Sequence, residues 1–415
     1  IGSGKGPSMR STAPTTDLPV LSRRRAMALG LGAGAALILP RPAFANVSDF
    51  VASVWPEASS RGVSRAIFEQ AFAGFTPSDR IMSLTRSQPE TVKTTGQYVA
   101  DAVSSTRVSN GRSMRGEWAQ TLGGAEQRYG IQSEIILAIW GMETNYGSYM
   151  GGNNVIHALA TLTYGNYRRD FFKSELLTAL QILQAGHVAA PQMVGSWAGA
   201  MGHTQFMPSS FVAYAVDYNG NGKRDIWNSV PDALGSAANY LKSHGWRSGE
   251  TWGYEVQLPS GFDYGRAWDI GRQTLGQWEA MGVRRTGGRN FPRSGDMGRI
   301  FMPSGGSGPV FLLLANFDVI KRYNNSDNYA LAVGHLADRI LGVGPFIRSF
   351  PANETGLTRS QREELQSLLN RRGYNVGTPD GVVGPKTRQG IIAFQRAAGL
   401  LADGHASSAL LSALR

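Results

Sequence analysis

The sequence predicts a mainly α-helical protein of the α+β class, with a large helical region, a small β-containing subdomain and a small three-helix C-terminal module. Apolar residues recur at helical spacing through much of residues 46–250 and again over 327–341. Short β-like runs broken by Gly, Pro and Ser occupy 251–310. A further helical unit follows a linker at 346–356. With 415 residues, 42% of them hydrophobic, the chain can bury a sizeable core in two or three domains.

Residues 1–45 have the pattern of a cleavable export signal. Three arginines at 23–25 precede an apolar stretch over 26–39, and Ala-Phe-Ala at 43–45 predicts cleavage after Ala45. An ordinary secretory signal and a twin-arginine signal both fit. The apolar stretch is short for a bilayer span, which disfavours an uncleaved anchor. The mature protein is therefore expected to be soluble and periplasmic, or otherwise exported.

Charge and cysteine content narrow the class further. The net charge is +11, and residues 1–45 carry six basic residues against one acidic residue, so removing their +5 leaves +6 on the mature chain. This moderate excess suits an anionic polymer such as a cell wall, and no long Lys/Arg run indicates nucleic acid. The absence of Cys excludes disulfides, thiolate metal sites, cysteine nucleophiles and the lipidated cysteine of a bacterial lipoprotein.

Residues 131–147 combine an apolar helix with one glutamate. Nearly every position from Ile135 to Met142 is apolar, which predicts a buried helix over Glu134–Met142. Glu143 follows at its end, before a loop of Thr, Asn, Tyr and Gly. Burial disfavours the charged form of a carboxyl and raises its pKa, so we expect this group to donate a proton to a glycosidic oxygen. The alternative is structural: Glu143 caps a loop or pairs with an arginine in the core.

A conventional glycosidase needs a second carboxylate. Between Glu143 and Asp217 the only acids are Asp170 and Glu175, on a predicted helix over 170–183. Basic residues beside both favour surface ion pairs as their role. The pattern therefore fits one glutamate that acts as acid and then base, with a substrate hydroxyl as nucleophile. A partner carboxylate from a distant segment remains the alternative.

The segment 195–211, "GSWAGAMGHTQFMPSSF", has the composition of a sugar-binding loop. Its small residues would let a sugar approach the backbone closely, and Ser196 and Gln205 offer a hydroxyl and an amide. The alternative is an ordinary Gly/Ala-rich loop whose Met and Phe side chains belong to the core.

A third motif, "DYNGNGKRDIW", has the start of a calcium loop. Asp217, Asn219 and Asn221 occupy positions 1, 3 and 5 of an EF-hand loop, with Gly at position 6 and the carbonyl of Lys223 at position 7. Position 12 departs from the pattern, because Asn228 stands where a bidentate Glu is expected. A turn rich in Asx residues and without metal is the alternative.

Residues 357–415 form the separate C-terminal unit. The stretch "LQSLLNRRGYNVGTPDGVVGPKTRQGIIAFQRAAGLLADG" resembles the peptidoglycan-binding domain found at the ends of many cell-wall hydrolases. The alternative is a generic helical addition, in which Gly381, Gly384 and Pro385 only form turns.

Four motifs together resemble the lytic murein transglycosylases of the B type: "AIWGMETNYG", "GSWAGAMGHTQFMPSSFVAYAVDYNGNGKRDIW", "ANYLKSHGW" and "NFDVIKRYNNSDNYALAVGHLAD". The resemblance implies a lysozyme-like catalytic domain with an enlarged helical scaffold over 46–345, followed by the linker at 346–356 and the peptidoglycan-binding domain at 357–415. It also implies cleavage of the β-1,4 bond between N-acetylmuramic acid and N-acetylglucosamine, with a 1,6-anhydromuramoyl product.

Carried over by motif position, Glu143 is the catalytic acid/base. Ser196 and Gln205 match polar residues placed to assist it and to hold the muramoyl sugar. Further matches to cleft positions of the family are Tyr240, Tyr323 and Asn324, for which a packed aromatic and a turn are the structural alternatives. His203-Thr204 stands where the family often has Gln-Pro or Tyr-Gly, so the contacts of His203 are not predicted.

The resemblance also completes the calcium loop, because a later family carboxylate matches Asp232. The implied ligands of a structural calcium ion are Asp217, Asn219, Asn221, Lys223 and Asp232. No organic cofactor is expected.

The sequence thus predicts an exported peptidoglycan lytic transglycosylase whose partners are peptidoglycan glycan strands, with no nucleic acid and no stable membrane anchor. A hydrolytic muramidase is the alternative within the enzyme class. A non-catalytic cell-wall-binding protein is the alternative from another class.

Overall fold

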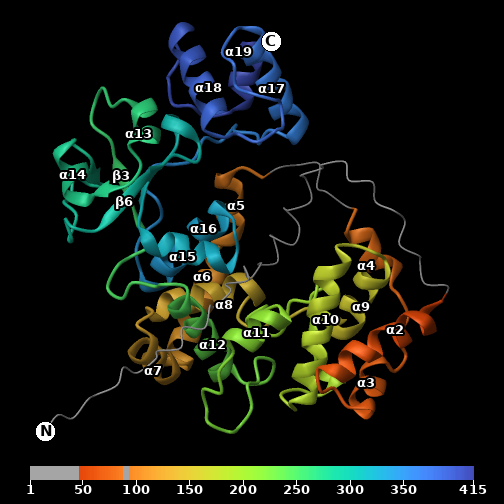
Figure 1. Cartoon of the computed structure of the whole chain (residues 1–415). Coiled ribbons are helices and arrows are strands. Elements are labelled where there is room, and N and C mark those ends of the chain that lie inside the picture. The colour runs from red at the N-terminus through yellow and green to blue at the C-terminus, as the bar shows by residue number, and fades with distance from the viewer. Residues whose placement is uncertain (1–45, 87–92) are drawn as a thin grey trace, which may run out of the picture.

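The computed structural model describes residues 46–86 and 93–415, so the predicted export signal lies outside the described residues. Helices dominate, and the C-terminal module lies at one end of the molecule, next to the small sheet and above α5 (Figure 1). The helices are α2 (Val47–Ser60), α3 (Arg65–Phe72), α4 (Asp79–Leu84), α5 (Thr95–Ala102), α6 (Ser105–Glu117), α7 (Ala119–Tyr129), α8 (Ser133–Thr144), α9 (Val155–Tyr164), α10 (Arg169–Gln184), α11 (Pro208–Tyr214), α12 (Val230–Ser243), α13 (Tyr264–Ile270), α14 (Leu275–Ala280), α15 (Ala315–Tyr323), α16 (Asp327–Leu341), α17 (Arg359–Arg371), α18 (Pro385–Ala397) and α19 (Ser408–Leu414). The strands are β1 (Asn153–Asn154), β2 (Val194–Gly195), β3 (Gly253–Gln257), β4 (Gln273–Thr274), β5 (Arg284–Arg285), β6 (Met297–Phe301) and β7 (Val310–Leu313).

The main helical core is organised around α8 and α16. Every residue of α8 from Ile135 to Gly141 is buried, as its all-round apolar pattern predicts. The helix α16 packs against α8 and also contacts α5, α6 and α15. Both helices confirm the segments expected at 134–142 and 327–341, and their contact brings together parts of the chain that are far apart in sequence.

The predicted β-containing subdomain is a five-stranded antiparallel sheet in the order β4-β6-β7-β3-β5. The register pairs Gly253 with Leu313 and Ile300 with Leu312. The sheet has its own hydrophobic core, centred on the fully buried Trp278, whose indole donates to the carbonyl of Gly298 (2.9 Å).

The C-terminal module contains three helices around a third core, as predicted. Leu365, Leu369 and Ile391 are fully buried in this core. The capping box of Thr358 and Gln361 begins α17, and Pro385 occupies the first turn of α18, where a missing N–H costs nothing. Within residues 46–86 and 93–415, no helix is both long and apolar enough to cross a membrane.

The C-terminal turn of α16 carries an acid that titrates unusually. Asp338 accepts a hydrogen bond from the indole of Trp252 (3.2 Å), and burial raises its pKa from 3.8 to about 7. The folded protein therefore holds this proton more tightly than the unfolded chain does. The corresponding stability is present below about pH 4 and is lost as the pH rises through 7.

We expect Asp338→Asn to remove the loss of stability at high pH, because Asn keeps the hydrogen-bond acceptor for Trp252 but cannot ionise. Solvent screening of the partly exposed side chain reduces the expected gain at pH 8 to about 2 kcal/mol in the free energy of unfolding. Urea unfolding of both proteins at pH 4.5 and pH 8 measures it. A difference between variant and wild type that is the same at both pH values would contradict the assignment.

Candidate active site

Glu143 lies in the last turn of α8, where the chain turns out of the core. Asn145, the C-cap residue, adopts a left-handed conformation (φ 49°) that ends the helix. The hydroxyl of Thr144 then accepts the backbone N–H of Gly147 (3.0 Å) and folds the next loop back. The Glu143 side chain is half-buried as a result, and it lines an open pocket.

A tyrosine from α16 holds the Glu143 carboxylate. The Tyr329 hydroxyl donates to Oε1 of Glu143 over 2.7 Å, although 186 positions separate the two residues. Burial, followed by the charge of Glu143, raises the pKa of Tyr329 well above 10, so the phenol keeps its proton. The same two causes raise the pKa of the neighbouring Tyr323. The sequence analysis did not identify Tyr329, even though it lies in one of the quoted motifs.

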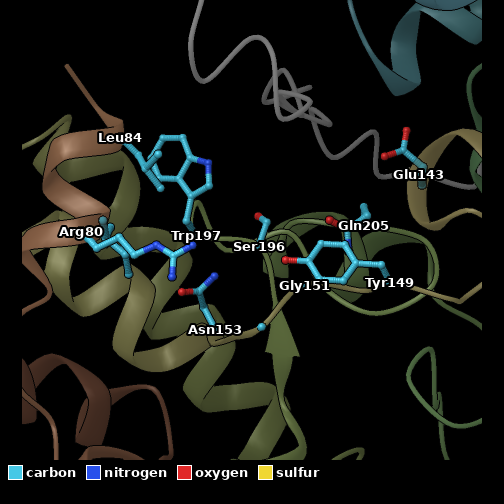
Figure 2. A pocket seen from close by; sticks show the side chains of 11 residues that line it. Arg80, Leu84, Glu143, Tyr149, Gly151, Asn153, Ser196, Trp197 and Gln205 are labelled. Carbon is cyan, nitrogen blue, oxygen red and sulfur yellow. The ribbon is translucent and has the colours of Figure 1, made fainter. Parts of the chain in front are cut away.

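The pocket at Glu143 has a volume of about 200 Å³ and is open to solvent. Figure 2 shows its side chains extending from Glu143 at one end to Arg80 and Leu84 of α4 at the other. Among the described residues, Glu143 is the only carboxylate that lines it. The lining residues are Arg80, Ile81, Leu84, Glu143, Tyr149, Gly151, Gly152, Asn153, Ser196, Trp197 and Gln205.

Ser196 and Gln205, the two polar residues singled out from the sequence, line the same pocket as Glu143 (Figure 2). The Ser196 oxygen accepts the backbone N–H groups of Ala198 (3.3 Å) and Ala200 (3.0 Å), so its own proton can be donated towards a ligand. The Gln205 amide donates to the carbonyls of Met150 and Gly202, and its backbone has a positive φ of 51°. Such strain in a non-Gly residue is typical of functional sites.

The pocket floor requires glycine. Gly151 has φ 103°, and a Cβ built there would lie 2.1 Å from the carbonyl oxygen of Gly195. The strands β1 and β2 pair at this point, with Asn153 opposite Gly195. The loop after α8 and the loop that carries Ser196 are thereby joined without side chains between them, which leaves backbone accessible to a sugar.

Other lining side chains were not assigned from sequence. Tyr149 is 71% exposed at the pocket edge, where its ring can stack on a sugar face. Trp197 and Arg80 add a second aromatic surface and a cation at the far end. Exposure of an aromatic residue depends on tertiary packing, so local sequence patterns carry no signal for it.

The contacts of His203 are internal. Its Nδ1 accepts the indole N–H of Trp140 in α8 (3.0 Å), and burial lowers the pKa of His203 so that it stays neutral. Adding a Cβ at Gly147 would place it 2.3 Å from this ring. His203 therefore fixes the loop of Ser196 and Gln205 against the helix that carries Glu143.

The remaining cleft residues from the sequence lie behind the pocket rather than on its surface. Tyr240 is buried in an aromatic cluster, stacks on His244 (4.1 Å) and donates to the carbonyl of Arg322 (2.6 Å). Tyr323 donates to the carbonyl of Thr204 (2.8 Å). The side-chain oxygen of Asn324 is buried and has no hydrogen-bond partner among the described residues.

The expectation for Glu175 was wrong. Its carboxylate is buried, 5% exposed, and accepts the backbone N–H (2.9 Å) and hydroxyl (2.7 Å) of Ser209 at the start of α11. Helical spacing places it on the same face as the buried Phe172 and Ala179. The neighbouring Lys173 pairs instead with Glu57. Burial raises the pKa of Glu175, which does not line the pocket.

The predicted calcium loop is held by its own oxygens. Both carboxylate oxygens of Asp217 accept backbone N–H groups of the loop, and so do the side-chain oxygens of Asn219 and Asn221. Asp232 is fully buried, and its carboxylate accepts the backbone N–H groups of Tyr218, Asn219 and Asp225.

Within residues 46–86 and 93–415, no group of three or more His, Cys, Asp or Glu side chains is arranged to hold a metal ion. The loop donors of the described structure are nevertheless all oxygen, the type that calcium prefers. In addition, no Lys or Arg of the described residues forms an ion pair with Asp217 or the buried Asp232. The donor set therefore fits a hard cation.

Comparisons with known proteins identify the family of the chain. The family model described as "Transglycosylase SLT domain" matches residues 46–338, and the one described as "Putative peptidoglycan binding domain" matches 358–414. Membrane-bound lytic murein transglycosylase B of Escherichia coli K12 is 35% identical over 250 residues, which are 59% of this chain and 66% of that relative.

Solved structures extend the similarity to the fold. SltB3 from Pseudomonas aeruginosa, in complex with NAG-anhNAM-pentapeptide, is 46% identical with a TM-score of 0.84, over 89% of this chain and 99% of that one. Slt35 from Escherichia coli, in complex with calcium, is 30% identical with a TM-score of 0.57, over 71% and 92% of the two chains. These matches confirm the lysozyme-like fold with an enlarged helical scaffold. The chain therefore belongs to the transglycosylase SLT domain family, among the B-type lytic transglycosylases, and carries a C-terminal peptidoglycan-binding domain.

Proposed function

We propose that this protein cleaves the β-1,4 bond between N-acetylmuramic acid and N-acetylglucosamine in peptidoglycan and forms 1,6-anhydromuramoyl ends. The observation that carries the proposal is that Glu143 is the only carboxylate among the described residues that line the pocket, whose other lining groups are aromatic, amide, hydroxyl, glycine and aliphatic, with one arginine at the far end. Hydrolysis through a conventional pair of carboxylates would need a second acid at this pocket.

In this mechanism Glu143 first acts as an acid. Its protonated carboxyl donates to the glycosidic oxygen, the bond from that oxygen to C1 of the muramoyl sugar breaks, and the N-acetylglucosamine chain leaves as an alcohol. The resulting Glu143 carboxylate then accepts the proton of the muramoyl 6-hydroxyl, and O6 bonds to C1. Glu143 regains its proton in the second step, so no water is consumed.

The neighbouring residues have positioning roles in this proposal. Ser196 donates its hydroxyl proton to the muramoyl sugar, and Gln205 fixes the backbone of the loop through its two carbonyl contacts. Asn324 follows Tyr323, whose hydroxyl donates to the carbonyl of Thr204 and supports this loop from behind. Tyr240 supports Tyr323 through ring contact (4.8 Å between centroids).

Mass spectrometry of muropeptides released from purified sacculi tests the reaction. We expect products one water lighter than those of a hydrolytic muramidase digest of the same sacculi. Products of hydrolytic mass would replace the proposal with muramidase activity. If no soluble product forms, the protein is a cell-wall-binding protein without this activity.

We further propose that Asp217, Asn219, Asn221, the carbonyl of Lys223 and Asp232 bind a calcium ion. The support is the set of oxygen donors in this loop, which includes the carboxylates of Asp217 and the buried Asp232, together with the calcium complex of the related Slt35. When bound, the ion would supply positive charge to the loop between α11 and α12 and stabilise the fold without taking part in the reaction.

Calcium should therefore raise the thermal stability of chelator-treated protein. We expect 1 mM calcium to raise Tm by about 2–4 °C, consistent with a site of modest charge, and magnesium to raise it less. Differential scanning calorimetry and titration calorimetry measure the two effects. No binding and no rise in Tm with calcium would show that the loop is stable through its backbone hydrogen bonds alone.

The substrate also places the site of action outside the cytoplasm. Peptidoglycan is reached only by an exported protein, which agrees with the export signal predicted for residues 1–45. Western blotting of periplasmic and cytoplasmic fractions would test this localisation.

A further inference from the structure

A second pocket, of about 400 Å³, lies between the C-terminal module and the rest of the protein. Its walls come from the start of α5, from α13 and β6, from the start of α16, and from the module itself. Figure 1 shows the module packed at this side of the molecule, next to α13 and above α5. The pocket does not include Glu143, and the charged side chains that line it are Lys93, Arg299, Asp327, Glu354, Arg362, Arg388 and His405.

Most of these charges are already compensated. Ion pairs join Lys93 with Asp101, Arg299 with Asp318, Asp327 with Lys321, and Glu354 with His405. Lys321 thus balances the charge of Asp327, whereas Glu354 is held by the Ser304 hydroxyl and by His405, which carries a charge only when protonated.

Arg362 and Arg388 of the module are different, because their hydrogen bonds go to backbone carbonyls. Arg362 donates to the carbonyls of Gly381 (2.6 Å) and Leu357 (2.7 Å), and Arg388 donates to that of Gly404 (3.3 Å). Within residues 46–86 and 93–415, neither guanidinium forms an ion pair. Burial lowers the pKa of both groups, because a buried guanidinium loses part of the solvation of its charge, and the nearby carboxylates of Glu363 and Asp403 offset this only in part.

The geometry fixes Arg388 in place for a ligand. Its guanidinium lies over the ring of Trp268, 3.7 Å from the centroid, and the Trp268 indole donates to the carbonyl of Asp403 (2.9 Å). The Asp403 carboxylate is nearby, but it accepts hydrogen bonds from Gly306, Gln395 and His405. A stacked, pre-oriented guanidinium loses little entropy when it binds a planar anion such as a carboxylate.

We propose that this interdomain pocket binds a carboxylate of a peptidoglycan stem peptide through Arg362 and Arg388. The inference rests on the proposed function, since it takes peptidoglycan as the polymer that both domains contact. The stem peptides carry free carboxylates at regular positions along the glycan, and a cationic pocket of this volume accommodates the end of a peptide. Because its walls come from both domains, the pocket couples binding by the module to the position of the strand on the catalytic region.

The test is a binding experiment with the Glu143→Gln protein, in which cleavage is expected to be strongly slowed. The probe is the soluble stem peptide released from purified sacculi by an amidase, compared with the same peptide after its carboxyl groups are converted to amides. We expect the Kd for the acid peptide to rise about tenfold or more in Arg388→Met, because a charge-assisted hydrogen bond is lost. The Kd of Arg388→Lys should lie between the values for Arg388→Met and for the protein with Arg388 intact, since lysine keeps the positive charge but lacks the planar guanidinium.

Arg396→Met is the matched control. Arg396 also joins the module to the rest of the protein, through Asp263 (3.2 Å), but it does not line the pocket. A general loosening of the domain contact would weaken binding in both Met variants, whereas the proposal predicts an effect only at Arg388. The proposal would be overturned if Arg388→Met left the affinity of the Glu143→Gln protein for the acid peptide unchanged. It would also be overturned if the Glu143→Gln protein with Arg388 intact bound the acid and the amidated peptide equally well.

Failure of the proposed function has a separate readout. Wild-type protein is assayed on glycan strands from which the amidase has removed the peptides, and anhydro products are followed by mass spectrometry. Cleavage there, without a charge effect on peptide binding, removes the pocket proposal and keeps the enzyme. The reverse result removes the enzyme and keeps the binding site.

Discussion

Glu143→Gln should lower the rate of peptidoglycan cleavage by about a thousandfold or more, because general acid–base catalysis by one positioned group contributes roughly 10²–10⁴ and this group acts in both steps. The amide keeps the shape of the side chain, and its oxygen can still accept the Tyr329 hydroxyl. It cannot give a proton to the leaving oxygen or take one from the 6-hydroxyl. Release of soluble muropeptides from sacculi, followed over time, measures the loss.

Glu175→Gln is the control for this experiment. Glu175 is also a buried glutamate, yet it lies outside the pocket and binds Ser209. Since burial raises its pKa, the neutral amide is a close substitute, and we expect less than about a twofold change in cleavage. If Glu143→Gln retained activity comparable to that of Glu175→Gln, another group would have to be the acid.

The sequence predicted the local parts of this site well. An all-round apolar pattern identified the helix that ends at Glu143, and small residues with Ser196 and Gln205 identified the opposite loop. Both features depend on neighbours in the chain. The structure places the three residues around one pocket.

Contacts between distant elements were harder to predict. Periodicity gives the buried face of α16 but not its register against α8, so Tyr329 could not be told from an ordinary core aromatic. For the same reason Tyr240 and Tyr323 were expected in the cleft but lie behind its surface. Glu175 was misassigned because neighbouring basic residues outweighed its position on the buried face of its helix.

The pocket between the domains illustrates the same limit. Arg388 and Trp268 are 120 positions apart, and neither belongs to a motif that predicts their contact. Only the packing of the module against α13 brings them together. The sequence therefore defines each domain better than it defines what the domains form jointly.

Tyr329→Phe should affect catalysis strongly while leaving the fold intact. The substitution removes one hydroxyl from a buried ring, and the carboxylate that loses this donor lies at an open pocket where water can replace it. We expect kcat to fall about 10- to 100-fold with a smaller change in KM, because a misplaced acid weakens the transition state more than substrate binding.

The pH profile separates this positioning role from a purely structural one. Since the Tyr329 hydroxyl stabilises the ionised form of Glu143 and the reaction starts from the protonated form, loss of this hydroxyl should move the alkaline limb of the cleavage profile to higher pH. Burial keeps Tyr329 protonated, so the phenol itself contributes no ionisation to the wild-type profile below pH 10. Tyr323→Phe is the matched control: its hydroxyl donates to a backbone carbonyl instead of the carboxylate, and the profile should keep its shape. If both variants lost activity equally with unshifted profiles, the Tyr329 hydroxyl would serve packing alone, and Glu143 would be oriented by α8 and the loop of Ser196 and Gln205.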